Sequence, residues 1–218
     1  MGGLPFFEYL KTFRSELIFD SQQHILLSVQ VLACAAVLGL GIAILTYRST
    51  IFSNAAVNFS SVLFTLPSIA LFGLMVPITG LGLATAFPIL VLYALLPIIR
   101  NAVVGLQSVD ADMVDAARGL GMARSRILLQ IELPIAWPVI LTGIRVAGQL
   151  TVGLVVIAAY VRGPGLGTGI LHALSALGSV NTFNEALAGT LLVVLLALAL
   201  DLVFVLVRRL TTPRGLRV

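Results

Sequence analysis

Fifty-one consecutive residues without a charged side chain, numbers 49 to 99, separate Arg48 from Arg100: STIFSNAAVNFSSVLFTLPSIALFGLMVPITGLGLATAFPILVLYALLPII. As one helix this run would measure about 77 Å at about 1.5 Å per residue, whereas about 20 apolar residues suffice to cross the ~30 Å hydrocarbon layer of a membrane. Pro77, Gly80 and Gly82 place turn-forming residues within the run. The sequence therefore predicts two membrane spans here, over residues 55–78 and 81–99.

The composition of the whole chain is that of a membrane protein. Of the 218 residues, 59% are hydrophobic and 10% are charged, against about 45–50% and about 25% in soluble domains. The 13 basic residues are scattered rather than gathered in a stripe, so nucleic-acid binding is excluded, as are the soluble, disulfide-linked secreted and disordered classes. Three further apolar segments, 25–47, 138–160 and 186–207, complete the set. The predicted fold is an all-α polytopic membrane protein with about five transmembrane helices.

The distribution of lysine and arginine predicts the side of the membrane that each loop faces. Three basic residues fall on one side of the five spans: Lys11, Arg14 and Arg162. Nine fall on the other: Arg48, Arg100, Arg118, Arg124, Arg126, Arg208, Arg209, Arg214 and Arg217. Because cytoplasmic loops carry the excess of basic residues, the C-terminus and the 100–137 loop are expected inside, and the N-terminus and the 161–185 loop outside.

This topology divides the chain into three parts. Residues 1–24 form an outer-interface segment, in which Phe6–Phe19 has the apolar spacing of a short amphipathic helix; no cleavable signal peptide is recognisable in it. Residues 25–207 form the transmembrane domain, and residues 208–218 a basic cytoplasmic tail.

The sequence lacks motifs for catalysis, nucleotide binding and metal binding. A P-loop needs a lysine beside glycines, and the sole lysine, Lys11, has none suitably placed. Cys34 is the sole cysteine, so an intrachain disulfide or a cysteine metal cluster is impossible. His24 and His172 stand alone outside the predicted spans and are expected at the surface, and Gly163–Gly169 is expected to be a tight outer turn. We therefore expect neither enzymatic activity nor a cofactor or metal in this chain.

Two charged residues lie inside the predicted spans, Arg145 and Asp201. Each is seven residues from the expected cytoplasmic edge of its span, which places both about 10 Å deep. Embedded charges usually find partners, which predicts an ion pair; the alternative is that Arg145 contacts inner-loop carbonyls or extends to the interface. Glu185 has capping-box spacing from Thr182 and is predicted to be structural, with its acid near the backbone of Thr182.

The two spans of the uncharged run contain four prolines: Pro67, Pro77, Pro88 and Pro97. A proline frees a carbonyl, which is tolerated in a membrane only where protein or water satisfies it. Thr65, Pro67, Ser68 and Tyr93 are therefore candidates for lining a transport path. The alternative is ordinary packing of kinked helices.

Two helices are predicted within the loop of residues 107–133, and the first of them is short. Asp110 is a good N-cap, and Gly119 and Gly121 provide a stop. The helix places four small or apolar side chains on one face: Met113, Ala116, Ala117 and Leu120. Such a face suits docking of a partner, although a helix folded back against the ends of the spans would have the same spacing.

The residues of this loop resemble a family motif. Asp115-Ala116-Ala117, Gly121, Ile131 and Leu133-Pro134 match the pattern EAA-x(3)-G-x(9)-I-x-LP of binding-protein-dependent ABC importer permeases, with Asp115 in place of the usual glutamate. Residues 60–170 are similar to the osmoprotectant subgroup, which imports glycine betaine, carnitine and choline, in the following segments: Thr65-Leu-Pro-Ser-Ile-Ala70, Leu96-Pro-Ile-Ile-Arg-Asn101, Gly119-Leu-Gly-Met122, Glu132-Leu-Pro134, Pro138-Val-Ile140, Gly143-Ile-Arg145 and Gly163-x-Gly-Leu-Gly167.

The resemblance implies a type I importer core in a bacterial plasma membrane. It implies partners as well: ATPase subunits that hold ATP and magnesium, a second permease copy or paralogue, and an external solute-binding protein. The residues expected to couple to the ATPase are Met113, Asp115, Ala116, Ala117, Leu120, Gly121, Ile131 and Pro134. The alternatives are a permease for amino acids or another small polar solute, a secondary transporter, and a membrane-anchored scaffold.

Overall fold

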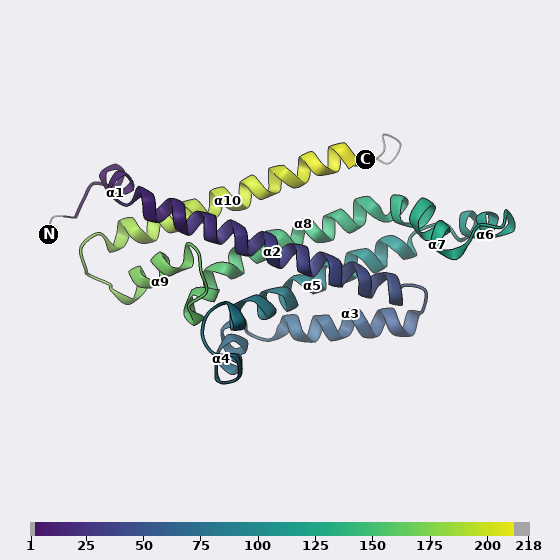
Figure 1. Cartoon of the computed structure of the whole chain (residues 1–218), viewed down its shortest axis with the longest axis horizontal. Helices are drawn as coiled ribbons and strands as arrows, with labels where there is room; N and C mark the ends of the chain where they lie inside the picture. Colours follow the sequence, from purple (N-terminus) through teal and green to yellow (C-terminus); the bar gives the residue numbers. More distant parts are fainter. Residues whose placement is uncertain (1–2, 212–218) are drawn as a thin grey trace.

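The computed structural model describes residues 3–211, and every regular element in this range is helical. The predicted basic tail beyond Thr211, with Arg214 and Arg217, lies outside the described residues. In chain order the helices are α1 (Phe6–Thr12), α2 (Arg14–Thr46), α3 (Thr50–Thr65), α4 (Ser68–Thr79), α5 (Leu83–Gln107), α6 (Ala111–Gly119), α7 (Arg124–Ile127), the π-helix η1 (Leu128–Glu132), α8 (Leu133–Ile157), the 3-10 helix η2 (Ala158–Val161), α9 (Gly167–Ser175) and α10 (Thr182–Thr211), arranged as in Figure 1.

Within residues 3–211, four helical stretches are long and apolar enough to cross a membrane: α2, α5, the continuous stretch Arg124–Val161, and α10. The pair α3 and α4 makes a fifth candidate, bent by 91° at its break. The predicted count of about five spans is confirmed. The predicted span over residues 55–78 is, however, not one helix.

The break between α3 and α4 falls at Leu66 and Pro67. Leu66 takes an extended conformation, with ψ 138°, because the ring of a following proline disfavours the helical region. Pro67 also lacks the N–H that would continue the helical hydrogen bonds. The predicted turn at the end of α4 is present, with Gly80 and Gly82 both at positive φ.

The first membrane helix begins earlier than predicted. The expected interfacial helix over Phe6–Phe19 divides at Phe13 into α1 and the first turns of α2. The whole of α2 is 33 residues long. His24 consequently lies within α2 rather than before a span. Its side chain is fully buried, so the prediction of a surface histidine is wrong.

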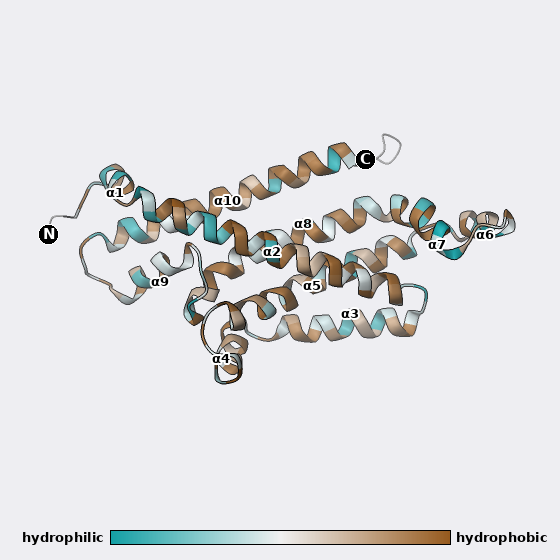
Figure 2. Cartoon of the chain, viewed as in Figure 1, coloured by the Kyte–Doolittle hydropathy of each residue, from teal (hydrophilic) through white to brown (hydrophobic). Residues whose placement is uncertain are grey.

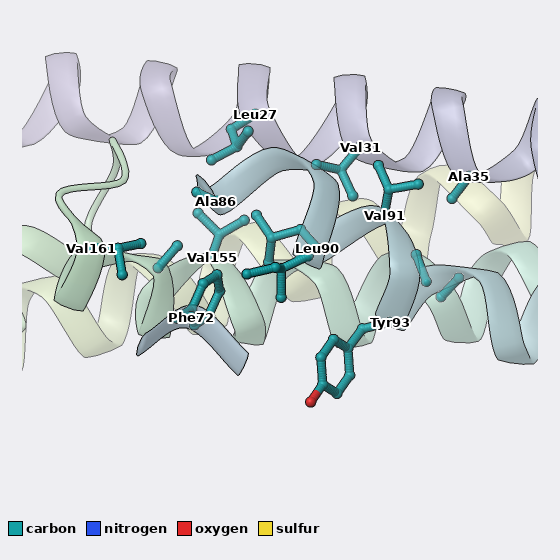
Figure 3. Close-up of a cluster of buried hydrophobic side chains, with 14 of the residues drawn as sticks. Leu27, Val31, Ala35, Phe72, Ala86, Leu90, Val91, Tyr93, Val155 and Val161 are labelled. Carbon is teal, nitrogen blue, oxygen red and sulfur yellow. The ribbon is translucent and has the colours of Figure 1, made fainter. Parts of the chain in front are cut away.

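The centre of the molecule is the crossing of α5 and α8, with α2 packed over both. Leu27 and Val31 of α2, Phe72 of α4, Leu90 of α5 and Val155 of α8 belong to one buried cluster (Figure 3). Membrane helices gain little stability from the hydrophobic effect when they pack against each other. They are held instead by close packing where small residues let the backbones approach.

Gly143 of α8 makes the closest such approach between α8 and α5. A methyl group at this position would lie 2.6 Å from both the Pro97 carbonyl oxygen and Asn101 Cβ of α5. Only a glycine therefore permits the two backbones to meet here.

Three helices lie at the margins of this core: α10, α6 and α7. α10 runs along one side of the bundle and is apolar over most of its length (Figure 2). α6 and α7 project beyond the ends of α5 and α8 (Figure 1). The molecule therefore has a packed centre, a peripheral membrane helix and a protruding end.

Candidate functional site

The protruding helix α6 has the bounds that its sequence predicts. The Asp110 carboxylate caps its start by accepting the Asp112 N–H at 2.9 Å. The helix ends at Gly119, and Gly121 follows with φ +81°. The backbone N–H of Met122 then donates to the Ala117 carbonyl at 3.1 Å. Glycine is the residue best suited to the positive φ of such a helix end.

Most of the predicted coupling residues on α6 are free of the rest of the chain. Met113 is 49% exposed and Leu120 85% exposed, and Ala116 is exposed as well. Ala117 is an exception, since only 5% of it is exposed; this part of the predicted docking face is wrong, because Ala117 turns toward the chain. The alternative of a helix folded back on the spans is not what the structure shows, since α6 stands beyond their ends (Figure 1).

The second half of the motif forms the base of this protrusion. Ile131 lies in the π-helix η1, where it is half-buried, and Pro134 follows at the start of α8, where it is exposed. A π-helix places one extra residue in a turn and is frequent at functional sites. Here that turn brings Glu132 inward, with 4% of the residue exposed.

Glu132 joins the base of the protrusion to the corner between α2 and α3. Its Oε2 accepts a hydrogen bond from the Tyr47 hydroxyl at 2.6 Å and one from the Arg48 guanidinium at 3.1 Å. Arg48 Nε also donates to the Tyr47 hydroxyl at 2.6 Å. From the end of α5, Gln107 Nε2 donates to the Tyr47 carbonyl at 2.8 Å. The bonds of Glu132 and Arg48 are charge-assisted, which makes them the stronger hydrogen bonds of this network, and the neutral bond from Gln107 adds α5 to it.

Sequence reasoning missed this network. Glu132 entered it only as part of a resemblance, and Tyr47 was placed at the end of an apolar span. The one signal in the sequence is that Glu132 is a single acid between apolar residues. It lies on the same predicted side of the membrane as Arg48, the only arginine between the first two spans. Nothing in the sequence gives the pairing of residues 85 positions apart.

The four predicted path residues come together at the break between α3 and α4. The hydroxyl of Tyr93, on α5, donates to the Leu66 carbonyl that the break leaves free. Thr65 ends α3, Pro67 and Ser68 begin α4, and the Tyr93 ring lies 5.7 Å from that of Phe64. The freed carbonyl is satisfied by protein, as a break within a membrane requires.

The predicted intramembrane pair is present. Arg145 Nε lies 2.6 Å from Asp201 Oδ1, and a second guanidinium nitrogen lies 2.7 Å from Oδ2. Gln149 adds a third hydrogen bond to Oδ1 at 2.6 Å. The bidentate geometry connects α8 to α10.

The end of α10 at Thr182 differs from its prediction. The Thr182 hydroxyl donates to the Ala176 and Ser179 carbonyls, while the Glu185 carboxylate lies 3.0 Å from His172 Nδ1 on α9. The expected contact of the acid with the backbone near Thr182 is replaced by this side-chain pair. The hydrogen bond to Glu185, with its negative charge, raises the pKa of His172.

The predicted outer turn closes over His24. A methyl group at Gly163 would lie 2.8 Å from the Ala158 carbonyl, and Gly165, at φ +121°, sits against the His24 side chain. His24 Nε2 lies 3.0 Å from the Val152 carbonyl of α8. The histidine therefore packs between the turn and α8. α9 begins at Gly167, within the segment that was predicted to be a turn.

Three comparisons with known proteins bear on this geometry. The family described as binding-protein-dependent transport system inner membrane component matches residues 35–214. The osmoprotectant import permease protein OsmW of Salmonella typhimurium is 34% identical over 89% of this chain and 91% of its own length. The glycine betaine/carnitine/choline transport system permease protein OpuCB of Bacillus subtilis is 27% identical over 96% and 94%.

Solved structures show the same fold. A chain of the inward-facing MetNI methionine ABC transporter superposes with a TM-score of 0.77 at 20% identity, covering 90% of this chain and 96% of the other. A chain of an amino acid ABC transporter superposes with a TM-score of 0.72 at 20% identity, covering 96% and 99%.

Proposed function

We propose that this chain, which belongs to the family of binding-protein-dependent transport system inner membrane components, carries osmoprotectants of the glycine betaine, carnitine and choline class. It is a permease of the ABC importer type, and relatives with these solutes in their names match it over most of its length. An amino acid is the second candidate solute. It is the weaker one, since the methionine and amino acid transporters share only 20% identity with this chain and so support the fold alone.

The observation that carries the mechanism is the protruding helix α6. In our proposal its exposed side chains seat on a separate ATPase subunit, which binds ATP and magnesium and hydrolyses the nucleotide. Met113 and Leu120 supply apolar contact, and Asp115, whose side chain is 68% exposed, supplies charge. Gly121 sets the angle at which the helix stands.

The Glu132 network is the proposed route from this helix to the membrane. Tyr47 and Arg48 follow the end of α2 at Thr46, and α3 begins at Thr50. A displacement of η1 therefore reaches the α2 and α3 corner through Glu132 rather than through α8 alone. In this role Glu132 is a positioning residue.

The remaining partners follow from the same proposal. Two permease chains, identical or paralogous, would enclose the path, with Thr65, Pro67, Ser68 and Tyr93 at its narrow part. The α6 end would face the bacterial cytoplasm together with the C-terminus. The α9 end and the N-terminus would face outward, where an external binding protein delivers the solute.

The coupling role is tested by Gly121→Val, with Gly119→Val as its control. Valine at φ +81° should strain the backbone by about 1–2 kcal/mol and turn α6, whereas Gly119 has an ordinary φ and, like Gly121, no atom within 4 Å of an added Cβ. We expect Gly121→Val to insert normally but to lose ATPase binding and uptake, and Gly119→Val to keep both. Normal ATPase retention and uptake in Gly121→Val would contradict the coupling role.

The solute is tested by uptake into proteoliposomes that contain the permease, its ATPase and its binding protein. We expect ATP-dependent accumulation of labelled glycine betaine, competed by choline or carnitine and not by methionine. Uptake without the ATPase would instead indicate a secondary transporter, and competition by methionine alone would favour the amino acid alternative.

A further inference from the structure

One face of α3 carries a continuous polar stripe. It consists of Thr50, Asn54, Asn58, Ser61 and Thr65. At about 100° per residue these positions fall within an arc of about 80°, so they follow one line along the helix. Figure 2 shows hydrophilic bands on α3 among its apolar residues.

The other faces of α3 are accounted for. Ser53 and Ser60 are buried on the side that packs against the neighbouring helices. Phe52, Phe59 and Val62 are 65%, 68% and 62% exposed on a separate apolar arc, which suits contact with lipid. The polar stripe lies between these two faces and belongs to neither of them.

The two asparagines decide what the stripe can face. The hydroxyls of Ser61 and Thr65 donate to carbonyls of their own helix, at 2.7 Å in both cases, so they tolerate lipid. Asn54 and Asn58 are exposed, and their side-chain amides make no hydrogen bond to any residue between 3 and 211. A primary amide without partners is costly in hydrocarbon, and polar residues inside membranes face protein or a water-filled cavity.

We infer that this stripe is a water-exposed wall of the transport path that extends into the membrane from the side that carries α6. It starts beside the Tyr47, Arg48 and Glu132 network and extends about 22 Å along the helix. It ends at Thr65, next to the break where Tyr93 holds the Leu66 carbonyl. Thr65 and Pro67, both exposed, therefore join the stripe to the break, while Tyr93, only 6% exposed, holds the break from within the helix bundle.

The chemistry of the stripe indicates how it treats a solute. The amides of Asn54 and Asn58 offer hydrogen bonds to water and to a carboxylate, and the Ser61 and Thr65 hydroxyl oxygens can accept from water. The stripe carries no fixed charge that would hold a cation. Passage requires contacts weak enough to release the solute. The inference rests on the proposed function only in calling the water-filled space a transport path.

Cysteine accessibility tests the inference. Cys34 is the only cysteine, so Cys34→Ala gives a background in which Asn58→Cys and its neighbour Phe59→Cys are compared. Both positions are exposed in the single chain, yet only the first lies on the stripe. The probe is a membrane-impermeant quaternary ammonium methanethiosulfonate, applied to membrane fragments that are open on both sides and hold the permease with its ATPase. Modification is followed by protein mass.

The expected result is modification at residue 58 about tenfold or more faster than at residue 59, because only a thiol in contact with water ionises to the reactive thiolate. Ser61→Cys and Val62→Cys form a second pair, in which the serine replacement is nearly isosteric, in case Asn58→Cys folds poorly. Equal rates within both pairs would overturn the inference. So would slow modification at residue 58 with disulfide cross-linking of two copies, which indicates a dry contact between permeases.

The outcome is independent of the solute. Fast modification at residue 58 in a transporter that does not accumulate glycine betaine would refute the proposed solute and leave the stripe in place. Glycine betaine uptake with slow modification at residue 58 would refute the water-exposed stripe and support the proposed solute.

Discussion

The helices α5 and α10 differ in a way that hydropathy does not foretell. α10 is the most apolar of the candidate spans, with mean hydropathy 3.0 against 2.1 for α5, yet 6% of its most apolar stretch is buried against 67% in α5. In a soluble protein the more apolar helix would be the more central one. In lipid the order reverses, because lipid is as apolar as leucine and does not drive such a helix inward.

What holds each helix follows from this difference. α5 is held by close backbone approach, at Gly143 and also at Gly105, where an added methyl would lie 3.1 Å from the Ala136 carbonyl. α10 is held at separate points by polar pairs: Arg145 with Asp201, His172 with Glu185, Trp137 Nε1 with the Thr211 hydroxyl at 2.8 Å, and the Asn184 amide with the Leu4 carbonyl at 2.6 Å. The centre depends on close packing, and the periphery depends on polar contacts between side chains.

The largest effect is expected from adding one methyl group at the centre. Gly143→Ala places a Cβ within 2.6 Å of α5 and should cost about 1–3 kcal/mol through overpacking. Gly153→Ala, on the same helix with open space around it, should be neutral or stabilising by up to about 1 kcal/mol. Thermal unfolding of the two purified variants measures the difference. Equal melting temperatures would show that backbone approach is not what holds α5 to α8.

A smaller effect is expected from removing one charge of the α10 pair. Asp201→Leu leaves Arg145 within the membrane with Gln149 as its remaining polar neighbour, so the melting temperature should fall and α10 should become accessible to protease. The double variant with Arg145→Leu should recover most of the loss, because two apolar residues in lipid need no partner. If the double variant is no more stable than Asp201→Leu alone, the pair must contribute more than the neutralisation of two charges.

The smallest effect is expected at the outer end, where it depends on pH. Glu185 raises the pKa of His172 above its ordinary 6.5, so the protonated pair adds stability that is complete below about pH 6.5 and is lost as pH rises through the raised pKa. His172→Gln should remove this dependence, and thermal unfolding between about pH 5.5 and about pH 9 covers the range. An unchanged pH profile would exclude the pair as a stabilising contact in solution.

Local features were predictable from the sequence, and distant pairings mostly were not. The bounds of α6 follow from Asp110 and Gly121, because a cap and a stop act within a few residues. The Arg145 and Asp201 pair was predictable because both residues lie at the same depth in the membrane, and depth can be compared between spans that are far apart in the sequence.

The errors have physical causes. The break at Pro67 was read as a kink within one span, because a proline does not reveal whether tertiary contacts such as that of Tyr93 will satisfy a full break. His24 was expected at the surface because its partner, the Val152 carbonyl, is 128 residues away. Hydropathy likewise could not rank α5 above α10, since both values exceed what lipid requires.

The unbroken helical stretch Arg124–Val161 has a mechanical consequence. Its 38 residues make a rod of about 57 Å at helical rise, which runs from the base of the protruding helix to the outer glycine turn. Gly143, where the rod touches α5 most closely, is 19 residues from its first residue and 18 from its last. The closest contact with α5 therefore lies near the midpoint of this stretch. A rigid tilt about that contact would move the glycine turn as far as the α6 end, in the opposite direction, because no loop interrupts the helix between them.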